Sequence, residues 1–292
     1  MGPFSTKTSA AWLSVGSNAV LIVLKLAVGL YIGAVSVVAE AIHSGVDLLA
    51  AVIALVSVRA SVRPPDEDHQ FGHGKIEGVS GAAEGLLIFV GAALIVNEAI
   101  DKLLGGSALE EPGLGVAVMF VSTVVNWVVA RQLHAVARKQ DSLALEADAE
   151  HHRTDVITSL GVLGGLAAVL VLNAPILDPI LALAVAALIV RAAWNITYKS
   201  YAALIDSRLP HDEYQKIEQV LADHGSHFVE YHRLRTRKSG AQRYIALDLV
   251  FNPDAHLSEV HDVCDHVESE IHAVLPGASV QIHVEPPGTV DR

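Results

Sequence analysis

Long apolar runs alternate with short polar connectors over the first two thirds of the chain. A helix that crosses a bilayer needs about 20 mostly apolar residues, and six runs approach or exceed this length. Their approximate cores are residues 10–32, 34–58, 79–100, 113–130, 144–172 and 176–193. The pattern therefore predicts a membrane α-helical bundle of six transmembrane helices, although ionisable side chains interrupt the second and the fifth.

The pattern changes near Arg208, where the sequence becomes mixed and polar. Residues 211–225 and 257–275 have helical periodicity, residues 231–251 alternate like two strands joined at Ser239-Gly240, and residues 277–286 form a short final strand pattern. The order α-β-β-α-β fits a small α+β domain with its helices on one sheet face. We expect residues 1–206 to form the membrane domain and residues 207–292 a separate domain.

The basic residues of the connectors predict the orientation of the bundle. Positive charge is concentrated after the second run (Arg59, Arg63, Lys75) and after the fourth (Arg131, Arg138, Lys139). The connectors after the first and fifth runs contain no lysine or arginine, and the one after the third has only Lys102. Because cytoplasmic loops carry the excess of Lys and Arg, this bias places both termini in the cytoplasm.

Composition agrees with a membrane protein and narrows its partners. Hydrophobic residues make up 52% of the chain and charged residues only 18%, whereas a soluble domain carries about a quarter charged residues. The net charge of −12 argues against nucleic acid as a partner. Cys264 is the single cysteine, so the chain can form neither an intrachain disulfide nor a thiolate metal cluster.

Two histidine–aspartate pairs stand inside the apolar runs. His43 and Asp47 lie four residues apart in the second run, and His151 and Asp155 repeat this spacing in the fifth. Residues i and i+4 share one face of a helix, and ionisable groups within membrane helices usually face the bundle interior and act in ion pathways. Two imidazoles and two carboxylates can complete a tetrahedral shell around a metal ion. The alternative is that each pair is a buried, hydrogen-bonded polar pair that locks helices together. His152, about 100° further round the helix, faces another surface.

The donor types favour zinc among divalent cations. Imidazole with carboxylate suits zinc, while all-oxygen sites suit magnesium, calcium or manganese. A ligating imidazole must be deprotonated, so metal entry displaces protons. We therefore hypothesise that metal and protons compete for one site, which is the minimal requirement for an antiporter.

The connector "PPDEDHQFGHGKIEG" contains a second candidate site. Asp66, His69 and His73 have the spacing of a metal site on the cytoplasmic side, and Gly72 and Gly74 free the backbone around His73. Histidines in polar loops are more often simply solvated. Two further residues offer ion pairs that would tie this loop to the helix ends (Lys75 and Glu77).

The C-terminal third holds most of the histidines and an excess of acids. This composition is typical of a cation-binding region, although solubility alone would also explain the acids. The candidate ligands are spread over several elements: His232, Asp248, His261, His283 and Glu285. Only His283 and Glu285, which alternate in one strand, are predicted to share a face. Periodicity alone does not assemble the five.

These motifs together resemble the cation diffusion facilitator family of zinc transporters. The resemblance covers nearly the whole chain and is carried by "AEAIHSGVD", "FGHGKIE", "HHRTD" and the polar C-terminal domain. It implies a homodimeric exporter in a bacterial inner membrane, with a ferredoxin-like cytoplasmic domain. It also implies three zinc sites: a transport site (His43, Asp47, His151, Asp155), a loop site (Asp66, His69, His73) and a binuclear cytoplasmic site (His232, Asp248, His261, His283, Glu285).

The chain departs from well-known bacterial members of this family at three positions. Those members carry histidine in place of Asp248, aspartate in place of Glu285 and, in many cases, aspartate in place of His43. Members with histidine at the last position tend to prefer zinc over cadmium, and an imidazole nitrogen in place of an oxygen penalises manganese and magnesium most. Cobalt, nickel and iron(II) stay open as cargo.

The function implied is export of zinc in exchange for protons by alternating access, rather than catalysis. An intramembrane metallohydrolase is a rival, but four ligands would close the shell that a catalytic zinc keeps open, and the chain has no HExxH motif. A membrane-bound metal sensor that transports nothing is a third interpretation.

Overall fold

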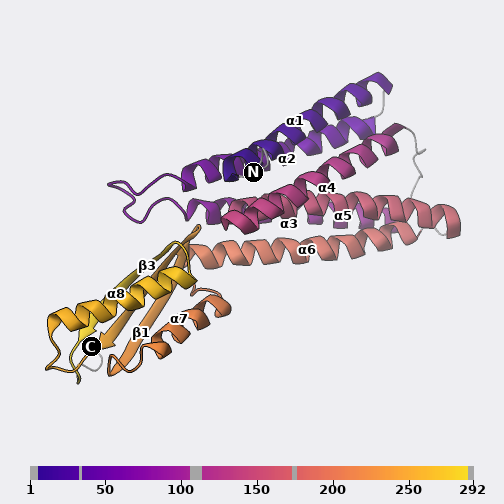
Figure 1. Ribbon diagram of the computed structural model, residues 1–292. Coiled ribbons are helices and arrows are strands. Elements are labelled where there is room, and N and C mark those ends of the chain that lie inside the picture. The colour runs from indigo at the N-terminus through magenta and orange to yellow at the C-terminus, as the bar shows by residue number, and fades with distance from the viewer. Residues whose placement is uncertain (1–5, 33–34, 106–113, 173–175, 289–292) are drawn as a thin grey trace. The chain divides into compact units, whose positions relative to one another are not determined.

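The computed structural model describes residues 6–32, 35–105, 114–172 and 176–288, and the chain folds into two compact units, Met1–Tyr201 and Ala202–Arg292. Within the described residues, the first unit is built from six long helices, which Figure 1 shows as a bundle. They are α1 (Lys7–Ile32), α2 (Val35–Ser61), α3 (Ile76–Gly105), α4 (Leu114–Gln140), α5 (Leu143–Leu172) and α6 (Leu177–Leu204). Each predicted apolar run corresponds to one helix, although α4 continues ten residues beyond its run and the first residues of the second and fourth runs, 34 and 113, lie outside the described residues.

Four of the helices found in the described parts of the chain are long and apolar enough to cross a membrane: those at Lys7–Tyr31, Ala41–Ser61, Ile76–Leu104 and Pro179–Leu204. Helix α4 ends in polar and basic residues, and α5 begins with acidic residues and two histidines, so both are less apolar. Six helices are therefore confirmed, while six membrane spans stay a prediction.

Small side chains bring the helices of the first unit close together. Ala50, Ala51 and Ala54 of α2 are fully buried. A Cβ added at Gly81 or Gly85 of α3 would come within 2.4 and 2.2 Å of the hydroxyls of α6 residues Ser200 and Thr197. Such contacts are typical of membrane helices, because lipid provides no hydrophobic force between helices and close packing drives their association.

A buried carboxylate joins four of these helices at one end of the bundle. Glu77, at the start of α3, is 1% exposed. It accepts hydrogen bonds from Lys7 Nζ at 2.8 Å, from Ser61 Oγ at 2.7 Å and from Ser142 Oγ at 2.7 Å. The ion pair expected of Glu77 is therefore present, and its partner is the first residue of α1.

The second unit has the predicted order of elements: α7 (His211–Asp223), β1 (Glu230–Ser239), β2 (Gln242–Val250), α8 (Leu257–Val274) and β3 (Ala278–Glu285). The sheet order is β1-β2-β3, with β1 and β2 antiparallel and β2 and β3 parallel. The turn between β1 and β2 falls at Gly240, whose φ of 60° is favourable for glycine. Helix α8 makes the crossover that a parallel pair requires.

One apolar core unites the sheet with both helices of this unit. The alternate residues Ile245, Leu247 and Leu249 of β2 are buried against apolar residues of α7 and α8, among them Ile217 and Ile271. Successive side chains of a strand point to opposite faces, so Asp248 lies on the other face of β2. The packing of the core thus determines the face on which the polar residues of the sheet gather.

Candidate metal sites

Three of the four residues predicted for the transport site converge between α2 and α5. A donor atom of each of His43, Asp47 and Asp155 lies within 4.8 Å of a donor atom of the other two. His43 is exposed, Asp155 half-buried and Asp47 only 6% exposed. The helical spacing of four residues therefore places a carboxylate in the interior and leaves an imidazole at the open side.

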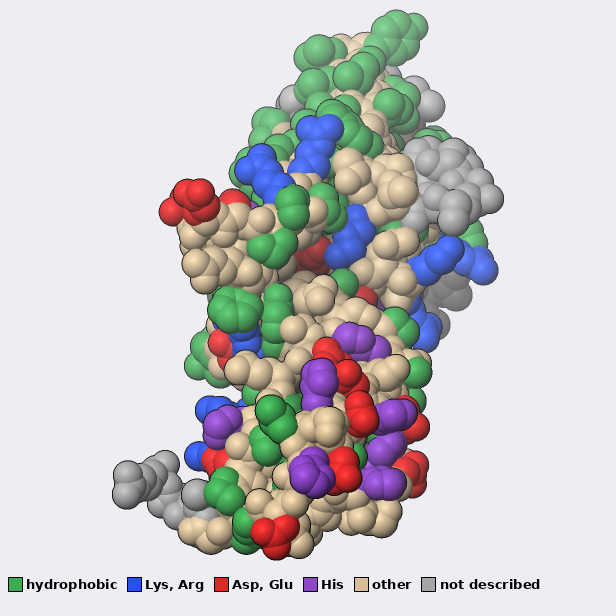
Figure 2. Space-filling model, turned by 60° about the vertical axis from the view of Figure 1, so that its left-hand side comes forward, with side chains coloured by type: hydrophobic (Ala, Val, Ile, Leu, Met, Phe, Trp, Pro, Cys, Tyr) green, Lys and Arg blue, Asp and Glu red, His purple; other side chains and the backbone are tan. Residues whose placement is uncertain are grey.

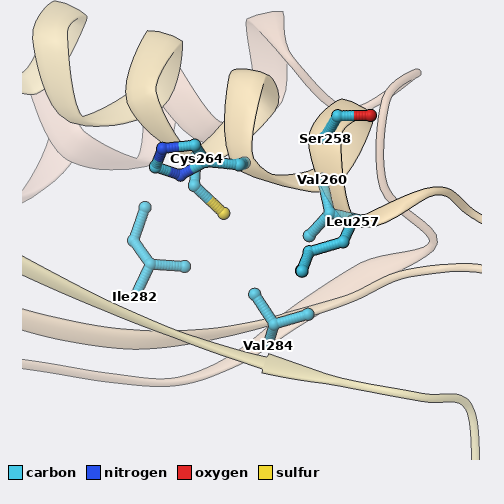
Figure 3. A pocket seen from close by; sticks show the side chains of 7 residues that line it. Leu257, Ser258, Val260, Cys264, Ile282 and Val284 are labelled. Atoms are coloured by element: carbon cyan, nitrogen blue, oxygen red, sulfur yellow. The ribbon is translucent and has the colours of Figure 1, made fainter.

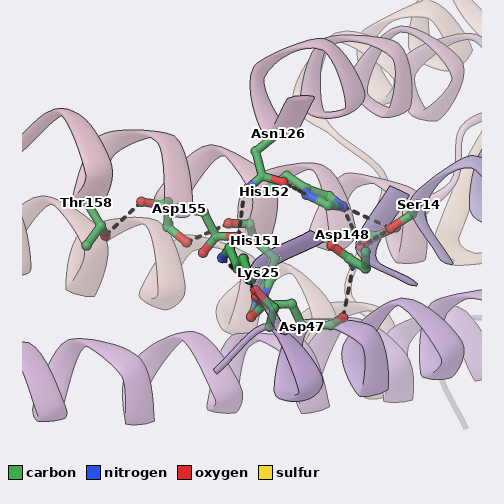
Figure 4. A network of polar contacts seen from close by, with 12 residues as sticks. Ser14, Lys25, Asp47, Asn126, Asp148, His151, His152, Asp155 and Thr158 are labelled. Atoms are coloured by element: carbon green, nitrogen blue, oxygen red, sulfur yellow. Dashed lines mark hydrogen bonds and ion pairs between the residues drawn. The ribbon is translucent and has the colours of Figure 1, made fainter. Parts of the chain in front are cut away.

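The fourth residue, His151, joins this cluster through Asp47. Its Nε2 lies 3.1 Å from Oδ1 of Asp47 (Figure 4). The two side chains are almost completely buried. Its Nδ1 is buried and has no hydrogen-bond partner among the described residues. His43, Asp47, His151 and Asp155 form the membrane cluster. The contact of His151 with Asp47 fits both a metal site without its ion and a polar pair that joins two helices.

A chain of polar contacts that the sequence did not predict runs away from this cluster (Figure 4). Asn126 Nδ2 donates to Oδ2 of Asp155 at 3.4 Å, and its Oδ1 lies 3.1 Å from Nδ1 of His152. The hydroxyl of Ser14 lies 2.9 Å from Nε2 of His152 and donates to Oδ1 of Asp148 at 3.1 Å. His152 is fully buried, and its two ring nitrogens contact Asn126 and Ser14.

Helix α1 adds a buried cation beside the cluster. Lys25 is 3% exposed and donates from Nζ to Oγ of Ser44 at 2.7 Å. Asn18 donates to the backbone carbonyl of Asp47 at 3.3 Å. The sequence contains a signal that could have identified Lys25, since it is a single lysine within an apolar run. Such a residue must find a polar environment inside the bundle.

The three loop residues also come together. Donor atoms of Asp66, His69 and His73 lie within 4.8 Å of one another, and the two imidazole rings are 4.4 Å apart. The backbone N–H of His69 donates to Oδ1 of Asp66 at 2.7 Å, which is the main reason why the pKa of this carboxyl lies below its usual value. Nε2 of His73 lies 3.3 Å from the other oxygen of Asp66. Gly72, with φ of 77°, lets the chain turn between the two histidines.

In the second unit, His232, Asp248 and Glu285 gather on the sheet face opposite the helices. Donor atoms of the three lie within 4.8 Å of one another. Nε2 of His232 lies 3.1 Å from Oε2 of Glu285 and 3.6 Å from Oδ2 of Asp248. The two carboxylates are buried, at 6% and 8% exposure for Asp248 and Glu285. These three residues form the tail cluster.

The two other predicted tail ligands lie differently. His283 is paired in register with Asp248, is exposed, and has its Nε2 3.5 Å from Oε1 of Glu285, so it borders the tail cluster. His261 is on α8, where its Nδ1 lies 3.5 Å from Oδ1 of Asp265. It lines an apolar cleft between α8 and β3 with six other residues, all of which are labelled in Figure 3. Among them are Cys264 of α8 and Ile282 and Val284 of β3. The structure therefore gathers four of the five and leaves His261 apart.

An arginine that the sequence did not single out occupies the tail cluster. Arg233 donates from Nε to Oδ2 of Asp248 and from one terminal nitrogen to Oε1 of Glu285. The donors of the tail cluster are of the types that zinc accepts, but both carboxylates already have a cationic partner. On the face of the second unit that Figure 2 shows, histidine and acidic side chains lie side by side.

Comparison with known proteins agrees with this architecture. The family model described as the cation efflux transmembrane domain matches residues 11–205, and that of the cytoplasmic domain of cation efflux proteins matches residues 209–287. The chain belongs to the cation diffusion facilitator family. It is accordingly an integral membrane cation efflux transporter with a transmembrane helical domain and a C-terminal cytoplasmic domain.

Relatives of the transporter match along almost their whole length. It is 32% identical to an uncharacterized transporter of Synechocystis sp. over 94% of this chain and 89% of the relative. It is also 32% identical to the cation-efflux pump FieF of Yersinia enterocolitica, over 94% of this chain and 90% of that one. A solved structure described as the metal-bound C-terminal domain of the CzcD transporter from Thermotoga maritima is 27% identical over 27% of this chain and 93% of its own, with a TM-score of 0.26. A score this low carries no conclusion about the fold.

Proposed function

We propose that this transporter exports zinc from the cytoplasm in exchange for protons, with the membrane cluster as its transport site. The observation that carries the proposal is the convergence of His43, Asp47 and Asp155, from two helices, with His151 in contact with Asp47. Two carboxylates and two imidazoles can neutralise and coordinate one dication without a further ligand.

The choice of zinc rests on the nitrogen donors. Half of the predicted ligands are imidazoles, which zinc accepts readily and which manganese and magnesium bind poorly compared with oxygen. Iron(II), cobalt, nickel, cadmium and manganese are the alternatives, and the relative rates of transport of these ions would distinguish them.

The choice of protons rests on the contact between His151 and Asp47. An imidazolium can hydrogen-bond to this carboxylate, whereas a metal-bound imidazole has lost its proton. Histidine titrates near physiological pH, so binding of the metal from one side and of protons from the other can alternate at the same atoms. We infer that α2 and α5, which carry all four side chains, rearrange to expose the cluster first to the cytoplasm and then to the opposite side.

The remaining parts of the proposal follow the charge bias and the family. Residues 1–206 form the transport domain of a bacterial inner membrane protein with both termini in the cytoplasm. Residues 207–292 form a metal-binding dimerisation domain, so the working unit is a homodimer. Zinc at the loop site (Asp66, His69, His73) and in the tail (His232, Asp248, His261, His283, Glu285) would report the cytoplasmic zinc concentration.

Proteoliposomes test the transport site directly. With an acidic interior and a zinc-sensitive dye inside, wild-type protein is expected to accumulate zinc, and dissipating the proton gradient is expected to stop accumulation. His43→Ala and Asp155→Ala should abolish it, whereas Asp101→Ala, an exposed acid of α3, should not. Zinc uptake at the wild-type rate by either cluster variant would refute the assignment. A sensor or a metallohydrolase would give no uptake with any of these proteins.

A further inference from the structure

The tail cluster contains its own permanent cation. The guanidinium of Arg233 bridges the carboxylates of Asp248 and Glu285, the same two side chains that would coordinate a metal there. Its own side chain is 41% exposed, whereas those of the two acids are 8% and 10% exposed. The cation therefore reaches inward from the surface to a buried pair of negative charges.

The backbone is shaped to make this contact. In a regular strand Arg233 would point to the face opposite its neighbour His232. The register between β1 and β2 shifts between His232 and Arg235, and Arg233 itself has a φ of 51°, which is uncommon for a residue with a side chain. A bulge of this kind redirects a side chain, and here it brings Arg233 to the same carboxylates that His232 contacts.

For electrostatic reasons, Arg233 and a metal ion compete for the same two carboxylates. Two neighbouring buried carboxylates are unfavourable without a cation, and the planar guanidinium satisfies both through a fork of donors that cannot lose its proton. A divalent cation needs the same oxygen atoms as ligands. If it bound beside the arginine, the charge of the cluster would change from negative to positive within a small buried volume.

We propose that Arg233 is an internal counter-cation that holds the tail cluster together without metal, and that a divalent transition metal binds there only by displacing it. The inference rests on one part of the proposed function, which is that the tail domain binds zinc. Its consequence is a tail that keeps its fold at low zinc and binds zinc at higher concentrations than the same ligands would alone. After displacement, the donors available are His232, Asp248 and Glu285, with His283 at their border.

Equilibrium binding of zinc to the full-length protein tests the proposal. Every protein compared carries Asp47→Asn and Asp66→Asn, which remove a ligand from the membrane and loop sites. In isothermal titration, Arg233→Gln is expected to bind zinc in the tail at least about tenfold more tightly than the protein with Arg233, because no charge has to be displaced. Arg235→Gln, which removes the same charge from an exposed position on the same strand, is the matched control and should bind as the parent does.

Thermal unfolding supplies a second measurement. Without metal, Arg233→Gln should unfold at a lower temperature than the parent and regain the difference when zinc is added. Should Arg233→Gln fail to fold, Arg233→Lys keeps the charge but loses the bridging fork, and it should bind zinc more tightly than the parent protein. Equal or weaker zinc binding by these variants would overturn the proposal. Zinc flux by the wild-type protein is measured separately, so failure of the proposed transport function and failure of this inference are distinguishable.

Discussion

The membrane cluster and the tail cluster are built from the same donor types but differ in the cation that faces their carboxylates. In the membrane cluster Asp47 is in contact with His151, whereas in the tail cluster Asp248 and Glu285 contact His232 and are in addition bridged by Arg233. An imidazolium can lose its proton near physiological pH, whereas a guanidinium cannot. A site with a histidine partner can therefore exchange protons for metal, while a site with an arginine partner is closed until that side chain moves.

A third buried carboxylate completes this comparison. Glu77 is held by Lys7 and two serine hydroxyls at the junction of four helices. Besides these three groups, the backbone N–H of Ala144 donates to Glu77 at 3.5 Å, and a lysine side chain is charged at neutral pH. We infer a structural role for Glu77, in contrast to the exchange role proposed for the pair of Asp47 and His151.

Replacing Asp47 should have the largest effect. Asp47→Ala removes the carboxylate that contacts His151 and belongs to the group with His43 and Asp155. Zinc flux in proteoliposomes should fall by more than the roughly 10–100-fold that loss of an outer-shell partner of a metal site causes. The exposed Asp101→Ala should keep the wild-type rate. Residual flux above one tenth of wild type would contradict the view that this pair is the exchange site.

Replacing Glu77 should affect stability more than transport selectivity. Glu77→Ala leaves the half-buried Lys7 and the hydroxyls of Ser61 and Ser142 without their carboxylate, and removing one partner of a buried pair costs about 3–5 kcal/mol. The melting temperature in detergent should fall clearly. Glu98→Ala, which removes the exposed pair of Glu98 with Lys102 at 3.1 Å, should cost about 0–1 kcal/mol. Equal shifts for the two variants would show that Glu77 is not a structural junction.

Changing His43 should alter the choice of metal while keeping transport. His43→Asp replaces an imidazole nitrogen by a carboxylate oxygen, which manganese tolerates better than the nitrogen. The ratio of manganese to zinc flux should rise by about tenfold, which corresponds to about 1.4 kcal/mol of discrimination. His134→Asp, at an exposed position of α4, serves as the control. An unchanged ratio would remove His43 from the set of ligands that select the ion.

The smallest expected effect concerns the single cysteine of the tail. Burial, with the nearby charges of Asp265 and Glu268, raises the pKa of the Cys264 thiol. Because the thiolate is the reactive form, alkylation at about pH 7 should be at least about threefold slower than that of free cysteine and should increase as the solution becomes more alkaline. Mass spectrometry of intact protein measures the rate, and Cys264→Ser corrects for reaction elsewhere. Labelling as fast as free cysteine would contradict the packing of α8 against the sheet.

The sequence by itself determined the local features of this protein. Runs of apolar residues predicted all six helices of the first unit, and alternation predicted the order of α7, β1, β2, α8 and β3. The spacing of four residues predicted that His43 shares a helix face with Asp47. These predictions succeed because helical and strand periodicities depend on neighbours within one or two turns.

Only the tertiary structure decided which distant side chains meet. The contact of His151 with Asp47 joins residues 104 positions apart, and that of Arg233 with Glu285 joins residues 52 apart. The second contact also requires a shift in strand register, which no period in the sequence records. Helix packing and strand pairing set such contacts, because they depend on how whole elements bury their apolar faces. The identity of the donors could thus be predicted from the sequence, whereas the cation that each set of carboxylates faces could not.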